Sequence, residues 1–160
     1  MPILDAETVA AERPADHKAE LRLWLRLLTC TTMVEQMVRT RLRERFDVTL
    51  PRFDLMAQLY RAAGGMTLGN LSRRMMVSNG NVTGLVERLV ADGQVERTTH
   101  PRDRRAAVVR LTPTGRDAFA AMAAEHEAWV ADAFAGLAPG DHAALMGALG
   151  RLKASVRGAA

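Results

Sequence analysis

The chain has 160 residues, 48% hydrophobic and 25% charged, with a formal net charge of +4, which fits one globular domain with a real core. Its longest apolar run is too short to span a membrane and its N-terminus is acidic, unlike a signal peptide, so we expect a cytoplasmic protein with no membrane partner. The single cysteine, Cys30, excludes an internal disulfide and a multi-cysteine metal site.

The first fifty residues predict an arm followed by one long helix. Residues 1–16 are rich in alanine, proline and acids without a period, so we expect a mobile arm. Residues 17–46 contain neither proline nor glycine and predict a helix that is apolar on nearly all sides in its first half. Because so small a protein cannot surround such a helix alone, we infer that a second subunit covers part of it.

Residues 51–93 predict a helix that begins near Pro51 and then two further helices joined by a tight turn. Thr67 can cap the first of this pair and Ser78 the second, which is the punctuation of a helix-turn-helix. Gly93 should end the last helix. One stripe of that helix should be buried, and it comprises Val82, Leu85, Val86, Leu89 and Val90.

The other face of the last helix is small, polar and uncharged at its N-terminal end. A helix that enters a DNA major groove needs such a face, because amides and hydroxyls pair with base edges and small residues let the backbone come close. We therefore predict DNA contacts by Ser78, Asn79, Asn81 and Thr83, of which Asn81 and Thr83 lie where base edges are read. Arg88, further along the same helix, is predicted to contact phosphate.

Two β-prone runs, 95–98 and 107–111, are joined by the loop His-Pro-Arg-Asp-Arg-Arg at 100–105 and predict a hairpin, or wing. Leu-Thr-Pro-Thr-Gly follows at 111–115. In these residues the chain resembles the MarR (multiple antibiotic resistance regulator) family, whose wing carries an Asp-x-Arg-Asp-x-Arg pattern and whose next helix begins Leu-Thr-x-x-Gly. The chain departs from this pattern at His100, which replaces the first Asp, a residue that helps to hold the wing's charges in the family.

The last fifty residues predict two helices. Thr112 should cap a helix that starts at Pro113 and continues to Leu137, where the run 138–140 breaks it. A final helix carries an apolar seam at steps of four, three and four, made of Leu145, Leu149, Leu152 and Val156. Together with the overlong first helix, these seams indicate a dimerisation module.

The resemblance spans residues 21–156 and implies a mainly α fold with a small β-wing. It implies a single MarR-like domain over 17–160, in which 51–112 form a winged helix-turn-helix lobe and 17–50 with 113–160 form the dimerisation helices. It also implies that Arg102 enters the DNA minor groove and that Asp103 with Arg105 holds the loop. We assign Arg104 to phosphate.

The excess positive charge lies in the predicted DNA-binding unit. Residues 68–110 hold eight of the 22 basic residues but only four of the 18 acids, so the rest of the chain is balanced at fourteen of each. This is the footprint expected for phosphate contact, and the alternative is a merely solvated charged face.

A ligand chamber is predicted between the long first helix and the helix after the wing, because methionine adapts to flat aromatic guests and tryptophan offers a stacking face. Its predicted residues are Arg22, Trp24, Arg26, Met33, Met37, His126 and Trp129. The alternative is that they are core or dimer-seam residues. The family resemblance implies release of DNA by aromatic carboxylates, and the runs 23–30 and 50–54 resemble the branch that regulates aromatic-acid breakdown, where the effector can be an acyl-coenzyme A thioester.

We therefore expect a homodimeric repressor that binds double-stranded DNA at a pseudo-palindromic operator and is released by a small aromatic carboxylate or its acyl-coenzyme A thioester. No enzyme activity, cofactor or metal is expected, because the four histidines lack metal-ligand spacing and no phosphate-binding loop or nucleophile motif occurs. Two alternatives stay open. One is a thiol-based redox regulator acting through Cys30, and the other is an architectural DNA-binding protein without an effector.

Overall fold

The computed structural model describes residues 19–159, except for the side chains of Arg104 and Arg105. The predicted arm, residues 1–16, therefore lies outside the described residues. The chain divides into two units, residues 1–126 and residues 127–160, with the boundary inside one helix. Among residues 19–159, no helix combines the length and the apolar character needed to cross a membrane.

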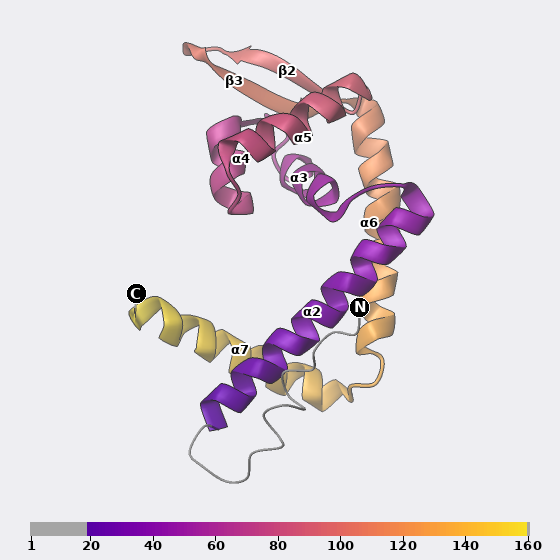
Figure 1. The fold of residues 1–160 in the computed structure, drawn as a ribbon, viewed down its shortest axis with the longest axis vertical. Coiled ribbons are helices and arrows are strands. Elements are labelled where there is room, and N and C mark those ends of the chain that lie inside the picture. The colour runs from indigo at the N-terminus through magenta and orange to yellow at the C-terminus, as the bar shows by residue number, and fades with distance from the viewer. Residues whose placement is uncertain (1–18, 160) are drawn as a thin grey trace. The chain divides into compact units, whose positions relative to one another are not determined.

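The first unit begins with the long helix α2 (Ala19–Phe46), followed by α3 (Leu50–Tyr60) (Figure 1). As predicted, the proline lies in the first turn of α3, where its missing N–H costs no hydrogen bond. The first half of α2 is apolar but uncovered in the single chain, since the Trp24 side chain is 56% exposed. Its second half buries Val38 and Leu42.

The predicted helix-turn-helix is confirmed as α4 (Leu68–Met75) and α5 (Asn79–Ala91). Both predicted caps are present: the Thr67 hydroxyl accepts the N–H of Asn70 and the Ser78 hydroxyl accepts the N–H of Asn81, each at 3.3 Å. Met76 ends α4 with a left-handed φ of 56°. This residue turns the chain into α5.

The buried stripe of α5 is shorter than predicted. Val82, Val86 and Leu89 are fully buried and Leu85 is half-buried, but Val90 is 42% exposed. At 3.6 residues per turn, Val90 lies about 80° of rotation away from Val82, at the edge of the buried face. The prediction was therefore wrong for Val90.

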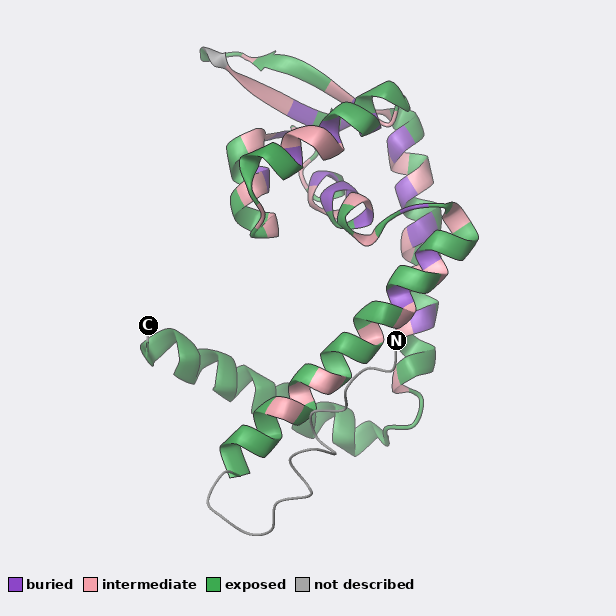
Figure 2. Cartoon of the chain, in the orientation of Figure 1, coloured by how far each residue is buried: buried purple, intermediate pink, exposed green. Residues whose placement is uncertain are grey.

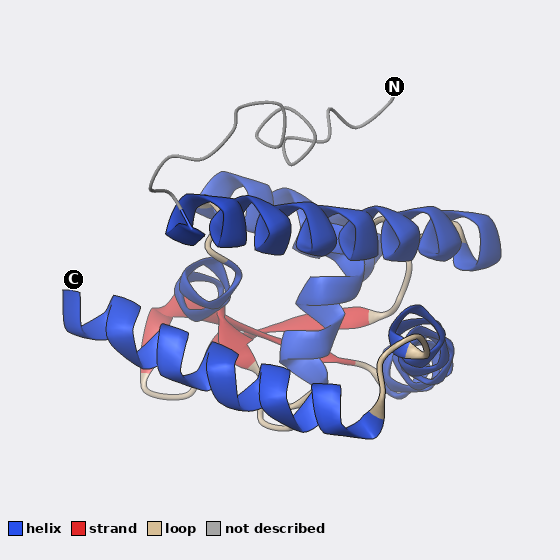
Figure 3. Cartoon of the chain, turned by 90° about the horizontal axis from the view of Figure 1, so that it is seen from below, coloured by secondary structure: helices blue, strands red, loops and turns tan. Residues whose placement is uncertain are grey.

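Three strands form one antiparallel sheet in the order β1-β3-β2, where β1 is Met66–Thr67, β2 is Val95–His100 and β3 is Asp103–Leu111 (Figure 3). Strand β1 was not predicted. The hairpin is also longer than predicted, because its turn is residues 101–102 and not 100–105. Backbone pairing continues past the last β-prone residue, and the register shifts between Thr99 and His100.

The core of the first unit gathers around α3, which buries four apolar side chains: Phe53, Leu55, Met56 and Leu59 (Figure 2). Leu71 of α4 and Val109 of β3 are fully buried as well. The winged lobe is thus built on one central helix.

The helix after the wing, α6 (Pro113–Phe134), begins as predicted, with the Thr112 hydroxyl accepting the N–H of Gly115 at 3.0 Å. It ends three residues before the predicted Leu137. Pro139 does not break it but is the first residue of α7 (Pro139–Ala159), a position that suits proline. Every residue of α7 whose burial is described is exposed, including the whole predicted seam (Figure 2).

Candidate nucleic-acid interface

The polar residues at the start of α5 fall into two groups. Two of them hold the helix: the Ser78 hydroxyl caps it, and the Thr83 hydroxyl donates to the carbonyl of Asn79 at 2.9 Å. The side chains of Asn79 and Asn81 are exposed. The amide groups of these two residues are therefore the ones best placed to pair with base edges.

Two glycines in α5 are not required by packing within the described chain. A Cβ added at Gly80 or at Gly84 would meet nothing within 4 Å. Glycine inside a helix costs about 1 kcal/mol relative to alanine, so this helix carries a cost that its own packing does not explain. Close approach of another backbone or of DNA would explain it.

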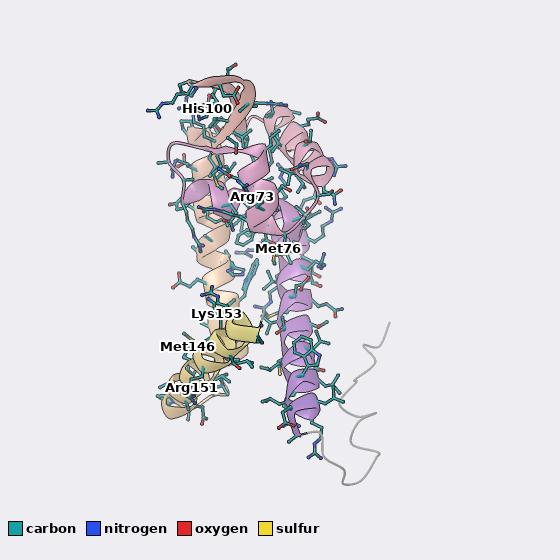
Figure 4. The ribbon with its side chains drawn as sticks, turned by 90° about the vertical axis from the view of Figure 1, so that its left-hand side faces the viewer. Arg73, Met76, His100, Met146, Arg151 and Lys153 are labelled. Carbon is teal, nitrogen blue, oxygen red and sulfur yellow. The ribbon has the colours of Figure 1, made fainter. Side chains whose placement is uncertain are left out.

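Exposed arginines occur on both helices of the helix-turn-helix. Arg88 is exposed in the last turn of α5, and Arg73 and Arg74 are exposed near the end of α4. Figure 4 shows Arg73 on α4 and His100 on the wing, two different elements of the same lobe. Arg73 and Arg74 counted in the predicted charge surplus, but sequence reasoning did not single them out as contacts.

The wing places some arginines outward and ties down others. Arg102 lies exposed in the turn of the hairpin, followed by exposed Asp103 at the start of β3. Arg110 forms an ion pair with Glu96, its partner in the neighbouring strand. The structure does not describe the side chains of Arg104 and Arg105, so their predicted roles stay predictions.

The far end of α5 is anchored by a contact that sequence reasoning missed. Nη2 of Arg52, on α3, lies 2.6 Å from the Asp92 carboxylate and donates to the Gln94 side-chain oxygen at 2.9 Å. The backbone carbonyl of Gln94 accepts the N–H of Thr112 at 3.0 Å. Gly115 packs so closely on that carbonyl that a Cβ would overlap it. This packing explains the Leu-Thr-x-x-Gly motif.

The predicted ligand residues are spread over two helices. On α2, Arg22, Trp24, Arg26 and Met33 are exposed and Met37 is half-buried, while on α6 His126 is half-buried and Trp129 is buried. The His126 ring packs at a tilt against the Phe53 ring of α3, with centroids 5.0 Å apart. Whether these residues bind a ligand stays a prediction.

Asp54 marks the place where α2, α3 and α6 meet. Although the residue as a whole is exposed, partial burial of its carboxyl removes water from that group and raises the pKa of Asp54 above its ordinary value of 3.8. Glu35 of α2 raises this pKa further, whereas His126 and Arg39 lower it. The charges of Glu35, Arg39 and His126 thus all act on Asp54, and of these four residues only His126 was predicted.

Among residues 19–159, no three His, Cys, Asp or Glu side chains gather in a group that could hold a metal ion. Cys30 is a free, exposed thiol on α2. The Tyr60 ring, on α3, contacts two side chains of α6. Its centroid lies 4.9 Å from the centroid of the Phe119 ring and 5.0 Å from the Arg116 guanidinium.

Comparison with known proteins gives a consistent result. A sequence model of the MarR family matches residues 48–107. The transcriptional activatory protein BadR of Rhodopseudomonas palustris is 38% identical over 119 residues, which cover 72% of this chain and 67% of BadR.

Two solved structures share the fold. A mutant MarR from Escherichia coli complexed with operator DNA aligns with a TM-score of 0.71 at 24% identity, covering 86% of this chain and 99% of that one. BpsR of Bordetella bronchiseptica, described in connection with regulation of its DNA binding by 6-hydroxynicotinic acid, aligns with a TM-score of 0.69 at 23% identity, covering 82% and 98%.

Proposed function

We propose the following function for this chain, which belongs to the MarR family of winged helix-turn-helix transcriptional regulators. It is a homodimeric repressor that binds a pseudo-palindromic operator. A small aromatic carboxylate or its acyl-coenzyme A thioester releases it from the DNA. As a member of that family, it is a DNA-binding regulator and not an enzyme. The observation that carries the proposal is the exposed amide face of α5 beside an arginine-bearing wing, within the segment that holds the whole excess of positive charge.

The DNA contacts are tested by two variants that should fail differently. Asn81→Ala removes an amide that reads a base edge, so it should cost about 1–3 kcal/mol of binding and relax the preference at one position per half-site. Arg88→Ala removes a phosphate contact, so it should weaken binding to all sequences about equally and reduce the salt slope by about 1 for each phosphate no longer neutralised. Titrations of selected and scrambled duplexes at several salt concentrations measure both. An Asn81→Ala protein with unchanged specificity would remove α5 from the reading role.

Support for the effector comes from groups near the α2–α3–α6 junction. His126 and Arg39 supply cationic or hydrogen-bonding groups there, and Phe53 supplies an aromatic face. Arg22 and Arg26 are four residues apart on α2, so they lie on the same side of the helix and suit the phosphates of a thioester. The fold is shared with BpsR, whose reported regulator is itself an aromatic carboxylate.

A thermal-shift screen tests the effector. We expect aromatic carboxylates or their coenzyme A thioesters to raise the melting temperature and, in a second assay, to release the selected duplex. An architectural DNA-binding protein would show neither response. His126→Ala should abolish both responses, and a full response in that variant would move the effector away from this junction.

A second candidate, transcriptional activation, is favoured by the description of BadR as an activatory protein. In vitro transcription from a promoter carrying the selected site distinguishes the two: added protein lowers the transcript yield for a repressor and raises it for an activator.

The alternative of a thiol-based redox regulator has its own test. It requires that peroxide change the DNA affinity of the wild-type chain and that the Cys30→Ser chain no longer show that change.

A further inference from the structure

His100 closes the turn of the wing. It ends β2 opposite Asp103, the first residue of β3, and only residues 101–102 lie between them. The backbone N–H of Arg102 donates to Nδ1 of the His100 ring at 3.1 Å. The ring is half-buried on the hairpin, where Figure 4 labels it. This hydrogen bond within the turn therefore orients the residue proposed to enter the minor groove.

This hydrogen bond exists only while the ring is neutral. An imidazole nitrogen accepts only when it carries no proton, so the proton of the neutral ring must be on Nε2, and the imidazolium has no acceptor at all. Histidine is the side chain that ordinarily changes charge between about pH 5 and 8. An aspartate, which the family pattern has at this position, would keep its acceptor oxygens throughout that range.

Charged residues of both signs lie on the hairpin near His100. Arg102, two residues on in the turn, repels an imidazolium, whereas Arg97 is three residues back on β2 and points to the other face of the strand. Asp103, opposite on β3, attracts it. Arg104 and Arg105 follow in β3. Glu96 is already engaged in its ion pair with Arg110.

We propose that His100 is a positioning residue for the wing, whose neutral Nδ1 holds the Arg102 backbone in the conformation that reads DNA. Protonation of the ring releases the turn, so sequence-specific binding weakens as pH falls. The imidazolium also adds a positive charge near phosphate, which favours binding to any DNA. The ratio of specific to non-specific affinity therefore falls in acid, although non-specific binding does not weaken. This inference rests on the proposed DNA contact by Arg102.

The test uses the full chain with a duplex that it selects from a random pool and a scrambled duplex of the same composition. Both are titrated at constant ionic strength at about pH 5.5, 6.5 and 8, a range that spans histidine titration. For the wild-type chain, the affinity ratio should fall about three- to tenfold from the highest to the lowest pH, the worth of one hydrogen bond. A constant ratio would overturn the inference.

Two substitutions at the same position are matched controls. His100→Asp retains an acceptor that does not titrate in this range, so the ratio should stay high at every pH, even though its negative charge lowers both affinities. His100→Ala has no acceptor, so the ratio should be low at every pH. A pH-dependent ratio in His100→Asp would assign the titration to another group.

Two further measurements separate this inference from the proposed function. If Arg102→Ala leaves the ratio unchanged, the proposed wing contact fails. If Arg102→Ala lowers the ratio but His100→Ala does not, the wing contact stands and the positioning role fails. The nitrogen-15 shifts of the His100 ring, measured without DNA, should show an unprotonated Nδ1 at pH 8, and a proton on that atom would contradict the hydrogen bond.

Discussion

The polar residues of α5 show at the scale of single residues how far sequence reasoning reaches. All four are polar residues at the N-terminal end of α5 and lie outside the buried stripe that the 3.6-residue period defines, so all four were predicted as contacts. The division between them depends on geometry: Ser78 and Thr83 bond to their own backbone, and Asn79 and Asn81 keep exposed amides. Serine, threonine and asparagine can all bond to nearby backbone, so their type alone does not tell which of them stay free to contact DNA.

Asp54 supports a prediction about stability and pH. Because the pKa of Asp54 is raised in the folded chain, the folded state binds more protons than the unfolded state between pH 3.8 and the raised value. The free energy of unfolding therefore falls as pH rises through that window, and the ionised carboxylate remains a net cost at neutral pH. We expect Asp54→Asn to raise the melting temperature at pH 7 but not at about pH 3, where the aspartate is protonated in both states.

Glu35 provides the internal control for this effect, since its charge is the second cause of the raised pKa of Asp54. In a Glu35→Gln chain, Asp54→Asn should raise the melting temperature less. Calorimetry on the four chains of this cycle measures the coupling. An unchanged or lower melting temperature for Asp54→Asn at pH 7 would contradict the expected cost.

At the scale of elements, the Arg52 contact fixes the end of the recognition helix to α3. Arg52→Met should lower the free energy of unfolding by about 1–2 kcal/mol, because it removes an ion pair and a charge-assisted hydrogen bond made by a mostly buried side chain. Arg43→Met is the matched control. Its ion pair with Asp47 is highly exposed, so its removal should cost less than about 0.5 kcal/mol. Urea unfolding measures both, and equal effects would remove the anchoring role.

Gly115 supports a second prediction at this scale. Gly115→Ala should destabilise the chain by about 1–3 kcal/mol, because the new methyl group overlaps the Gln94 carbonyl, a backbone atom already held by Thr112. Gly84→Ala is the opposite case, since its Cβ would enter open space and alanine favours a helix by about 1 kcal/mol. Thermal unfolding should shift in opposite directions for the two variants. A neutral Gly115→Ala would show that the α6 start can move away from the strand.

Sequence reasoning missed the features of the fold that leave no repeating apolar pattern in the sequence. Caps, prolines and apolar spacing located the helices from α2 to α7, but β1 is two residues long and is defined only by its pairing with Val108 and Val109 of β3. The predicted end of α6 was too late because the apolar pattern in the sequence continues past Phe134. In the structure the helix ends at Phe134, and the next two residues, Ala135 and Gly136, form a turn. The hairpin turn was predicted too long because its charged residues pair through their backbones.

At the scale of the whole molecule, the apolar surface of the single chain calls for a partner. The seam residues of α7 are between 37% and 61% exposed, and the first half of α2 leaves Leu23 and Trp24 more than half exposed. Monomeric proteins rarely leave apolar helix stripes of this kind uncovered, and a second copy of the chain is the proposed cover of each. Isologous pairing would give the protein the two-fold symmetry of a pseudo-palindrome.

Leu149→Asp should therefore break the dimer and, with it, operator binding. A charge on the seam would be buried without a partner, so the dissociation constant of the dimer should rise at least about tenfold. Ala154→Asp places the same charge on the opposite side of α7, about 180° of rotation from Leu145, and should leave the dimer intact. Analytical ultracentrifugation measures the assembly. A Leu149→Asp chain that stays dimeric would move the interface away from the seam.

Symmetry makes a further demand on the DNA that these two variants can test. Two recognition helices related by a two-fold axis enter successive major grooves about 34 Å, or roughly 10 base pairs, apart. Inserting about five base pairs between the half-sites rotates one of them to the far side of the duplex, so the wild-type chain and Ala154→Asp should lose most of their affinity. Leu149→Asp, binding as a monomer, should bind weakly and be indifferent to the insertion. If the wild-type chain tolerated the insertion as well, each lobe would be reading DNA independently, and the homodimeric operator complex would be wrong even with a dimer in solution.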